Sequence, residues 1–434
     1  MAPFAPLAAT LHELLGSVAQ TVAPKTLIRR QRKFSASSLL STFVLGYWQK
    51  PLARLDDLAH TAAQLGVEVS PQAIDKRFRP PLRDALRDLL RHALQTVLDT
   101  NPRAWPLLRS FTAVQLADST TIPLAPALAD EYPSGGGASE APAAMKIHVQ
   151  WDLISGQFVA AIADARASDN GSPIADAPLP AGSLVLRDLG YFDLDRFTRF
   201  NAGGVRWISR AKVNLVFTAD GRRHKLVDWL TRQRGRRIDR PILLGDQQVS
   251  CRLVACRVPA AVARQRRAAA IRKSHKKYGC APNRRQLAAC EWTMYVTNLP
   301  AEAFDAAAIH TIYRVRWQVE LLFKLWKSHA HLATHRSADP VRQMIELFAR
   351  LLGVLLQHWV VVTTGWQYAR LSVVKAARLV REFVPVLLSV WRDRVALAMA
   401  LEGLSRRIAL CRLTTRRKYP GTYQTLESQE NLQS

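Results

Sequence analysis

One short segment carries the residue types that phosphate chemistry needs. Residues 313 to 327 read Tyr-Arg-Val-Arg-Trp-Gln-Val-Glu-Leu-Leu-Phe-Lys-Leu-Trp-Lys. On one continuous helix, at ~100° per residue, a polar set shares one stripe: Tyr313, Arg316, Glu320, Lys324 and Lys327. The apolar residues fall on another side, which can pack on a core. A carboxylate among cations could bind a metal ion beside an anionic backbone, although a plain amphipathic helix with ion pairs four residues apart is the simpler interpretation.

Two aspartates elsewhere in the chain could complete such a site. Asp118 follows a mostly apolar run at 112–117, and Asp188 follows another at 183–186. We expect each at the end of a short strand, before a turn, and neighbouring strands would bring both carboxylates to one edge of a sheet. Carboxylates from several elements can hold two divalent ions that clamp the attacking and leaving oxygens of a phosphodiester, and hard oxygen ligands favour Mg²⁺. Taken alone, either aspartate could equally cap a turn.

Several motifs together resemble one protein family. The pattern Tyr-x2-Arg-x3-Glu-x6-Lys, from Tyr313 to Lys327, resembles the YREK signature of bacterial insertion-sequence transposases of the DDE group. The segments 188–192 (Asp-Leu-Gly-Tyr-Phe) and 114–120 (Val-Gln-Leu-Ala-Asp-Ser-Thr) resemble the elements that carry the second and first aspartates of that family. The segment 297–300 (Thr-Asn-Leu-Pro) resembles the one that closes the family's insertion.

The resemblance implies a fold, a reaction and roles for named residues. The implied fold is α/β: an RNase H-like mixed sheet core with a β-rich insertion, flanked by helical N- and C-terminal regions. The implied reaction is cut-and-paste transposition on double-stranded DNA, at the element ends and the target, with Mg²⁺ or alternatively Mn²⁺, by a homodimer in the synaptic complex. The catalytic metal ligands would be Asp118, Asp188 and Glu320. The phosphate ligands would be Tyr313, Arg316, Lys327 and, as a helper, Lys324, with Arg210 added because it follows a predicted strand at 205–209.

Two further features could contact DNA. Relatives with this architecture use an aromatic residue at the end of the insertion to stack a flipped base, and Trp292 stands at that place; a core tryptophan in a strand is the alternative. Residues 260 to 285 form a largely helical segment rich in cations and free of acids, which favours contact with DNA phosphates, through Lys273 and Lys276 among others. The simpler interpretation is that these charges form a solvent-exposed surface without a partner.

Composition points to the same class of partner. The chain has 434 residues, with 61 Lys and Arg against 34 Asp and Glu, a formal net charge of +27. Such an excess predicts a polyanionic partner, and its spread over the whole chain favours nucleic acid over a membrane surface. The most apolar stretch, 351–362, predicts a buried core helix. Five cysteines without a CxxC pair fit a reducing cytoplasm, and we expect no membrane partner. The family resemblance implies a bacterial protein associated with the nucleoid.

The pattern along the chain predicts five regions. Residues 1–105 are expected to be a helical, DNA-end-binding domain, with a helix-turn-helix or an ordinary helical hairpin at 58–78. Residues 106–211 would form the first part of the catalytic core, with a hairpin of strands at 146–153 and 158–163. Residues 212–298 would be the β-rich insertion with the basic segment, 299–335 the core helix with the YREK motif, and 336–434 a helical region with a polar tail.

Three functions remain open at this point. The first is an active DDE transposase. The second is a structure-specific DNA nuclease on the same core that performs no strand transfer. The third is a DNA-binding transposase relic without catalysis, which the full set of acidic and YREK residues disfavours.

Overall fold

The computed structural model describes residues 4–28, 33–103, 105–135, 141–172, 174–368, 370–413 and Leu426. The chain divides into two compact units. Unit 1 comprises Met1–Ala104, Ser119–Ala167 and Gln318–Tyr423, and unit 2 comprises Trp105–Asp118, Ser168–Trp317 and Gln424–Ser434. Apart from Leu426, the predicted polar tail after residue 413 lies outside the described residues.

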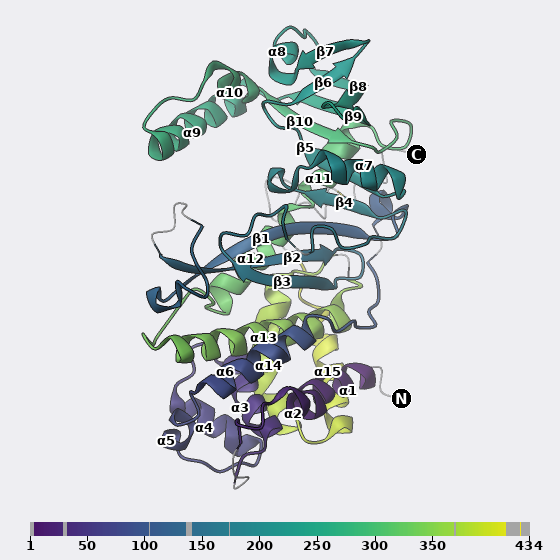
Figure 1. Ribbon diagram of the computed structural model, residues 1–434. Helices are drawn as coiled ribbons and strands as arrows, with labels where there is room; N and C mark the ends of the chain where they lie inside the picture. The colour runs from purple at the N-terminus through teal and green to yellow at the C-terminus, as the bar shows by residue number, and fades with distance from the viewer. Residues whose placement is uncertain are drawn as a thin grey trace. The chain divides into compact units, whose positions relative to one another are not determined.

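Among the described residues, ten strands form one mixed sheet in the order β3-β2-β1-β4-β5-β10-β9-β8-β6-β7 (Figure 1). With helical regions at both ends of the chain, this sheet confirms the predicted α/β, RNase H-like fold with a β-rich insertion. The strands are β1 Val114–Leu124, β2 Ala143–Asp152, β3 Phe158–Asp164, β4 Leu184–Arg187, β5 Arg206–Arg210, β6 Val216–Ala219, β7 Arg222–Lys225, β8 Arg237–Leu244, β9 Val249–Arg257 and β10 Trp292–Thr297.

The core strands of unit 2 are β1, β4 and β5, which run parallel. All four residues of β4, Leu-Val-Leu-Arg, are buried, as expected for a short apolar strand covered on both faces. Helix α7 (Leu194–Ala202) supplies the crossover from β4 to β5, which parallel strands require. This arrangement fixes the edge of the sheet at which the carboxyl ends of β4 and β5 emerge.

The insertion joins the core sheet through β10, which pairs antiparallel with both β5 and β9. The side chain of Thr297 donates to the carbonyl of Trp207 at 2.7 Å, and the amide N–H of Trp207 donates to the Oδ1 of Asn298 at 2.8 Å. The Nδ2 of Asn298 donates to the carbonyl of Val205, also at 2.8 Å. The Thr-Asn-Leu-Pro motif therefore fastens the end of the insertion to β5, because its side chains replace ladder hydrogen bonds that the end of β10 no longer makes.

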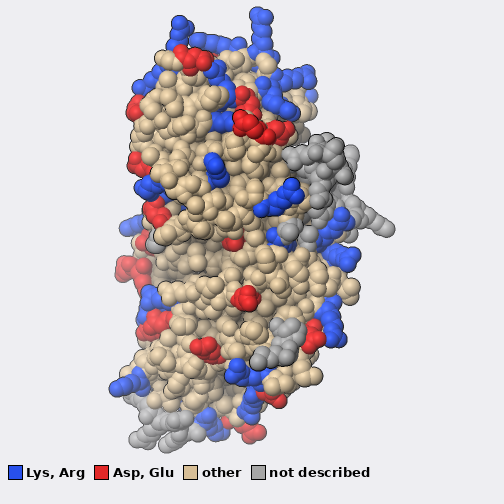
Figure 2. All heavy atoms as spheres, turned by 90° about the vertical axis from the view of Figure 1, so that its right-hand side faces the viewer, with Lys and Arg blue, Asp and Glu red and all other residues tan. Residues whose placement is uncertain are grey.

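The remaining helices of unit 2 lie in or after the insertion. They are α8 Leu226–Leu230, α9 Ala260–Tyr278, α10 Arg284–Ala289 and α11 Ala306–Arg314. Exposed Lys and Arg side chains are visible in Figure 2 at the end of this unit where β6, β7 and α8 lie.

One predicted strand boundary is wrong. The apolar run at 112–117 was expected to end at Asp118, followed by a turn, yet β1 continues through Asp118 to Leu124. Thr120 and Ile122 are buried, and β-branched side chains of this kind fit a half-buried strand. The second expected boundary holds, since Asp188 directly follows the last residue of β4.

The predicted single helix across the YREK segment is also wrong. Helix α11 ends at Arg314, and α12 (Trp317–His329) begins after a turn at Val315 and Arg316. The amide groups of these two residues donate to carbonyls three positions back, at Ile312 and Tyr313, the tighter pattern typical of a helix end. Tyr313 and Glu320 therefore lie on different helices. The apolar side, including Val319 and Phe323, is buried as predicted.

Unit 1 is mainly helical, with the antiparallel hairpin of β2 and β3 at the predicted place. Its central helix, α13 (Pro340–Gly365), has the length and composition of a membrane span, but its apolar window is entirely buried inside the protein. That burial agrees with the predicted core helix. The other helices of the unit are α1 Ala5–Glu13, α2 Ala19–Val22, α3 Ala36–Gln49, α4 Leu55–Gln64, α5 Pro71–Asp75, α6 Pro80–Ala93, α12, α14 Val373–Ser389 and α15 Arg394–Ile408.

The segment 58–78 consists of the end of α4, a glycine turn and the short helix α5, which both the helix-turn-helix and the helical hairpin would give. Gly66 turns the chain after α4 with φ +75°, a conformation that glycine adopts without strain. The hydroxyl of Ser70 caps α5 by accepting from the amide of Ala73 at 3.3 Å, and Pro71 occupies the first helical position. Helix α5 has only five residues. Contact of this segment with DNA stays a prediction.

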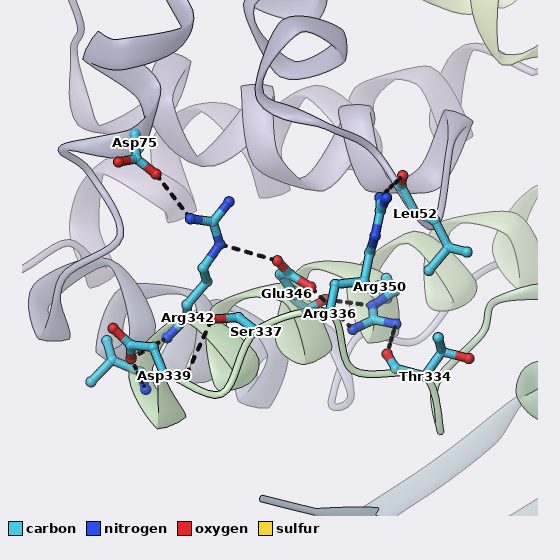
Figure 3. A network of polar contacts seen from close by, with 10 residues as sticks. Leu52, Asp75, Thr334, Arg336, Ser337, Asp339, Arg342, Glu346 and Arg350 are labelled. Carbon is cyan, nitrogen blue, oxygen red and sulfur yellow. Dashed lines mark hydrogen bonds and ion pairs between the residues drawn. The ribbon is translucent and has the colours of Figure 1, made fainter.

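A polar network joins three parts of unit 1 (Figure 3). Arg342 of α13 binds Asp75 at 2.9 Å, and Arg336 donates to the carbonyl of Leu52 at 2.6 Å. Arg350, fully buried on α13, donates to the carbonyls of His331 and Thr334 at 2.5 and 2.8 Å. The loop between α12 and α13 is thus held by cations both from its own sequence and from the next helix.

Stability should depend on pH through one buried histidine. His358 of α13 donates through Nε2 to the carbonyl of Gly156 at 2.7 Å, and burial lowers its pKa to about 4. The pKa of histidine in the unfolded chain is ~6.5. Neutral His358 therefore makes its full contribution to the free energy of unfolding above that pH, and the contribution is lost as the pH falls toward 4. We expect a loss of about 3 kcal/mol between pH 7 and pH 4 in the wild type, absent in His358→Gln. Urea denaturation at several pH values would measure it, and equal pH dependence in both proteins would refute it.

Candidate active site

The two predicted aspartates lie side by side on neighbouring strands. In the parallel register of β1 and β4, Ala117 is opposite Arg187. Asp118 is the next residue of β1, and Asp188 is the first residue after β4, at the point where the pairing ends. Both side chains are half-buried, and both belong to unit 2. The register therefore brings two carboxylates to the same edge of the sheet.

Asp118 is paired with a residue of the YREK segment. Nη1 of Arg316 lies 3.0 Å from Oδ2 of Asp118, with both side chains largely shielded from solvent. Arg316 reaches this position from the turn between α11 and α12. The turn thus places a guanidinium directly against the first aspartate.

Tyr313 supports the second aspartate. Its hydroxyl donates to the backbone carbonyl of Arg187, the residue before Asp188, at 3.1 Å. The pKa of Tyr313 is raised overall, mainly because the side chain is buried. The charge of Arg316 lowers this pKa, and the charge of Asp188 raises it. The phenol is therefore a protonated donor at neutral pH, and it fixes the backbone that presents Asp188.

Arg210 lies beyond Tyr313 in the same unit. It is exposed at the end of β5, and its charge acts on the phenols of both Tyr313 and Tyr295. The rings of these two tyrosines are 4.9 Å apart. Arg210 thus stands next to the aromatic residues that border the aspartates, where a cation could meet a phosphate.

The other YREK residues lie on α12. Glu320, in the first turn of this helix, is half-buried and follows Arg316 by four residues. Lys324 and Lys327 are exposed. Partial desolvation of the Lys327 ammonium group lowers the pKa of Lys327. From Gln318 onward the helix belongs to unit 1. The position of Glu320 beside the two aspartates stays a prediction.

Sequence reasoning missed Trp317, the residue after Arg316. Its side chain is 55% exposed. The predicted base-stacking residue, Trp292, is only 3% exposed and lies in a hydrophobic core. The guanidinium of Arg257 lies 4.8 Å from the centre of the Trp292 ring. The spacing carried a signal, since at ~100° per residue Trp317 lies beside the stripe of charges and away from the apolar side.

The basic segment forms a helix that extends from the insertion (Figure 1). At its base, Arg266 donates to the carbonyl of Trp292 at 3.1 Å, and Arg267 pairs with Glu291. Farther along α9, Lys273 and Lys276 are exposed. The inner cations therefore anchor α9 to β10, and the outer cations face solvent.

The acidic residues have the donor chemistry of a magnesium site. Two adjacent aspartates offer hard oxygen ligands, which Mg²⁺ prefers. Within the described ranges, however, no group of three or more His, Cys, Asp and Glu side chains is gathered as a metal site. Asp118 binds the Arg316 guanidinium in that arrangement. Asp118 and Asp188 supply donor oxygens of the kind that this metal prefers, and their role as ligands stays a prediction.

Comparison with known proteins gives a consistent result. The family described as Transposase DDE domain matches residues 109–356, more than half of the chain. The transposase for insertion sequence element IS231F of Bacillus thuringiensis subsp. israelensis is 29% identical over 357 residues, covering 76% of this chain and 74% of its own. The IS231D transposase of Bacillus thuringiensis subsp. finitimus is 26% identical over 374 residues, covering 80% and 77%.

A more distant relative gives the same picture. The transposase for insertion sequence element IS1151 of Clostridium perfringens is 24% identical over 316 residues, covering 68% of this chain and 66% of its own. The matched family segment includes Asp118, Asp188 and Glu320. Together with the mixed sheet and its paired aspartates, the match confirms the resemblance found in the sequence: this chain belongs to the family of insertion-sequence transposases with a DDE domain.

Proposed function

We propose that this protein binds the inverted-repeat ends of its own element, cleaves the DNA there and transfers the freed strands into target DNA. The observation that carries the proposal is the register that sets Asp118 and Asp188 one residue beyond the last pair of β1 and β4. Two carboxylates at one sheet edge suit phosphodiester chemistry, and membership of the family supplies the reaction class.

In this proposal, Asp118, Asp188 and Glu320 hold Mg²⁺, or Mn²⁺ in its place. The bound ion would activate water and offset the charge that builds up at phosphorus. Arg316, Lys324, Lys327 and Arg210 bind phosphate oxygens near the scissile bond. Arg316 balances the charge of Asp118 before DNA binds, as its ion pair indicates. Tyr313 holds the backbone of the Asp188 turn by its hydrogen bond to the preceding carbonyl.

An exposed aromatic ring next to Arg316 suits contact with an unstacked base. Stacking on an aromatic side chain is worth ~1–3 kcal/mol per base, and the exposure of Trp317 makes it better suited to this role than the buried Trp292. Trp292 would need to leave the core of the insertion before it could stack on a base.

Strand transfer by the purified protein tests the proposal. With Mg²⁺ and DNA that carries the element ends, we expect cleavage at the ends followed by a joined product with target DNA. Cleavage without a joined product would favour the alternative of a structure-specific nuclease. Specific binding without cleavage would favour a relic that only binds DNA. Joining two ends in one reaction requires a synaptic complex, for which we propose a homodimer acting at the nucleoid in the cytoplasm.

Neutralising the outer cations of α9 should weaken DNA binding in a salt-dependent way. Each phosphate contact contributes ~0.9 to the slope of log K against log salt. Because Lys273 and Lys276 are both exposed, the variant Lys273→Gln/Lys276→Gln should lower that slope by about 2. Fluorescence anisotropy across a salt series measures it. The matched control is Arg223→Gln, an exposed cation paired with Asp246; equal slopes in wild type and the double variant would remove α9 from the DNA interface.

A further inference from the structure

A segment that no sequence pattern predicted is hydrogen-bonded to residues on both sides of Asp188. This segment, residues 168–172 and 174–176, is referred to below as the clamp segment. Nη1 of Arg187 donates to the carbonyl of Ala175 at 2.8 Å. Arg196, 3% exposed, binds Asp176 at 3.1 Å and the side chain of Asn170 at 3.0 Å. Buried cations on both sides of Asp188 thus fix the clamp segment against the turn.

The clamp segment brings a further carboxylate to Gly190, two residues after Asp188. A Cβ atom added at Gly190 would lie 2.6 Å from Oδ2 of Asp169, a distance that real Cβ atoms do not tolerate. Gly190 is not among the described glycines with left-handed backbone. A side chain at Gly190 would therefore have to displace the Asp169 carboxylate, which is the far end of a flexible side chain.

A buried hydroxyl lies close to the strand end and to the clamp segment. Tyr191 is 1% exposed and packs on Ala117 and Ala175. Within the described part of the chain, its hydroxyl has no hydrogen-bond partner. Burial raises the pKa of Tyr191, the charges of Asp169 and Asp118 raise it further, and those of Arg187 and Arg196 lower it. An unsatisfied buried hydroxyl costs about 1–3 kcal/mol, and a water or ligand between these groups would remove that cost.

We propose that Asp169 is an outer carboxylate of the metal site, which accepts hydrogen bonds from the waters of a hydrated divalent cation held by Asp118 and Asp188. Mg²⁺ keeps several waters when protein ligands are few, and Tyr191 supplies a second polar partner for them. This inference rests on the proposed function, since it needs a cation at the two aspartates.

Manganese binding to the full chain without DNA tests the inference. The loss of an outer partner typically weakens metal affinity by about 10–100-fold, so we expect that range for Asp169→Asn in a titration of free Mn²⁺ by electron paramagnetic resonance. The control is Asp195→Asn, an exposed acid of α7 bonded to Gln247, which should bind Mn²⁺ as the wild type does. Thermal unfolding checks that both variants are folded.

A second variant tests the geometry separately. Gly190→Ala should displace the Asp169 carboxylate and reproduce the weaker Mn²⁺ binding, and it should add little in an Asp169→Ala background, where the methyl group has room. If Asp188→Asn weakens Mn²⁺ binding but Asp169→Asn and Gly190→Ala do not, Asp169 has no part in the site. If Asp118→Asn and Asp188→Asn bind Mn²⁺ like the wild type, the metal site of the proposed function fails instead.

Discussion

Replacement of Asp188 by asparagine is expected to abolish strand cleavage while leaving binding to the element ends intact. The change removes one negative charge and keeps the shape of the side chain. Metal ions contribute several kcal/mol of transition-state stabilisation, so the loss of a ligand should lower the cleavage rate on the order of a thousandfold or more. A gel assay for nicking and a mobility-shift assay for end binding would measure the two effects separately.

Structural damage is a poor explanation for such a loss. Asp188 stands at the start of the 3₁₀ turn Leu189–Tyr191, but its side chain makes no capping hydrogen bond there. Nearby Asp193 does cap α7, accepting from the amide of Arg196 at 2.9 Å. The control Asp193→Ala should therefore lose ~1 kcal/mol of stability and keep cleavage. Near-normal cleavage by Asp188→Asn would remove that residue from the site.

The pairing of Asp118 with Asp188 could be anticipated because it depends on local pattern. Short apolar runs before each aspartate predict buried strands, and parallel neighbours bring equivalent positions together. The exact end of β1 could not be predicted, because the residues that follow Asp118 are typical of turns. Burial of Thr120 and Ile122 in the folded chain outweighs that preference, and burial is a tertiary property.

The break in the YREK segment has a similar origin. Helical periodicity continues through Val315 and Arg316 without a Pro or Gly to stop it. Two tertiary contacts depend on the turn at this place: Arg316 meets Asp118, and the Tyr313 hydroxyl meets the carbonyl of Arg187. Partners 198 and 126 residues away in the sequence leave no trace in local periodicity, so a continuous helix was the natural expectation.

Segments without periodicity were missed altogether. The clamp segment is held by side chains of Arg187 and Arg196, not by a pattern of its own. Strand β7 reads Arg-Arg-His-Lys and is largely exposed, so no alternation of polar and apolar residues marks it. The clamp segment is held by distant arginine side chains, and β7 is held by pairing with a neighbouring strand. Contacts between distant positions cannot be recognised in the local sequence of either element.

The buried arginine of α13 that binds the α12–α13 loop should have the largest effect on stability. The side chain of Arg350 is fully buried, and its charge lies 3.6 Å from Glu346. It donates to the carbonyls of His331, Thr334 and Glu346. Methionine in its place keeps much of the volume but leaves those loop carbonyls without their donor and Glu346 with a weaker counter-charge. Breaking a buried pair in this way costs about 3–5 kcal/mol.

The expected result is that Arg350→Met lowers the free energy of unfolding by this amount, measured by urea denaturation. The matched control is Arg342→Met, since Arg342 also binds Glu346 but lies partly exposed and pairs with the exposed Asp75. An ion pair of that kind is worth about 0–1 kcal/mol. Adding Glu346→Leu to Arg350→Met should recover part of the loss, because the uncompensated buried charge is then removed. Equal losses in Arg350→Met and Arg342→Met would show that burial of the charge is not what makes Arg350 important, and that the loop after α12 is held by packing alone.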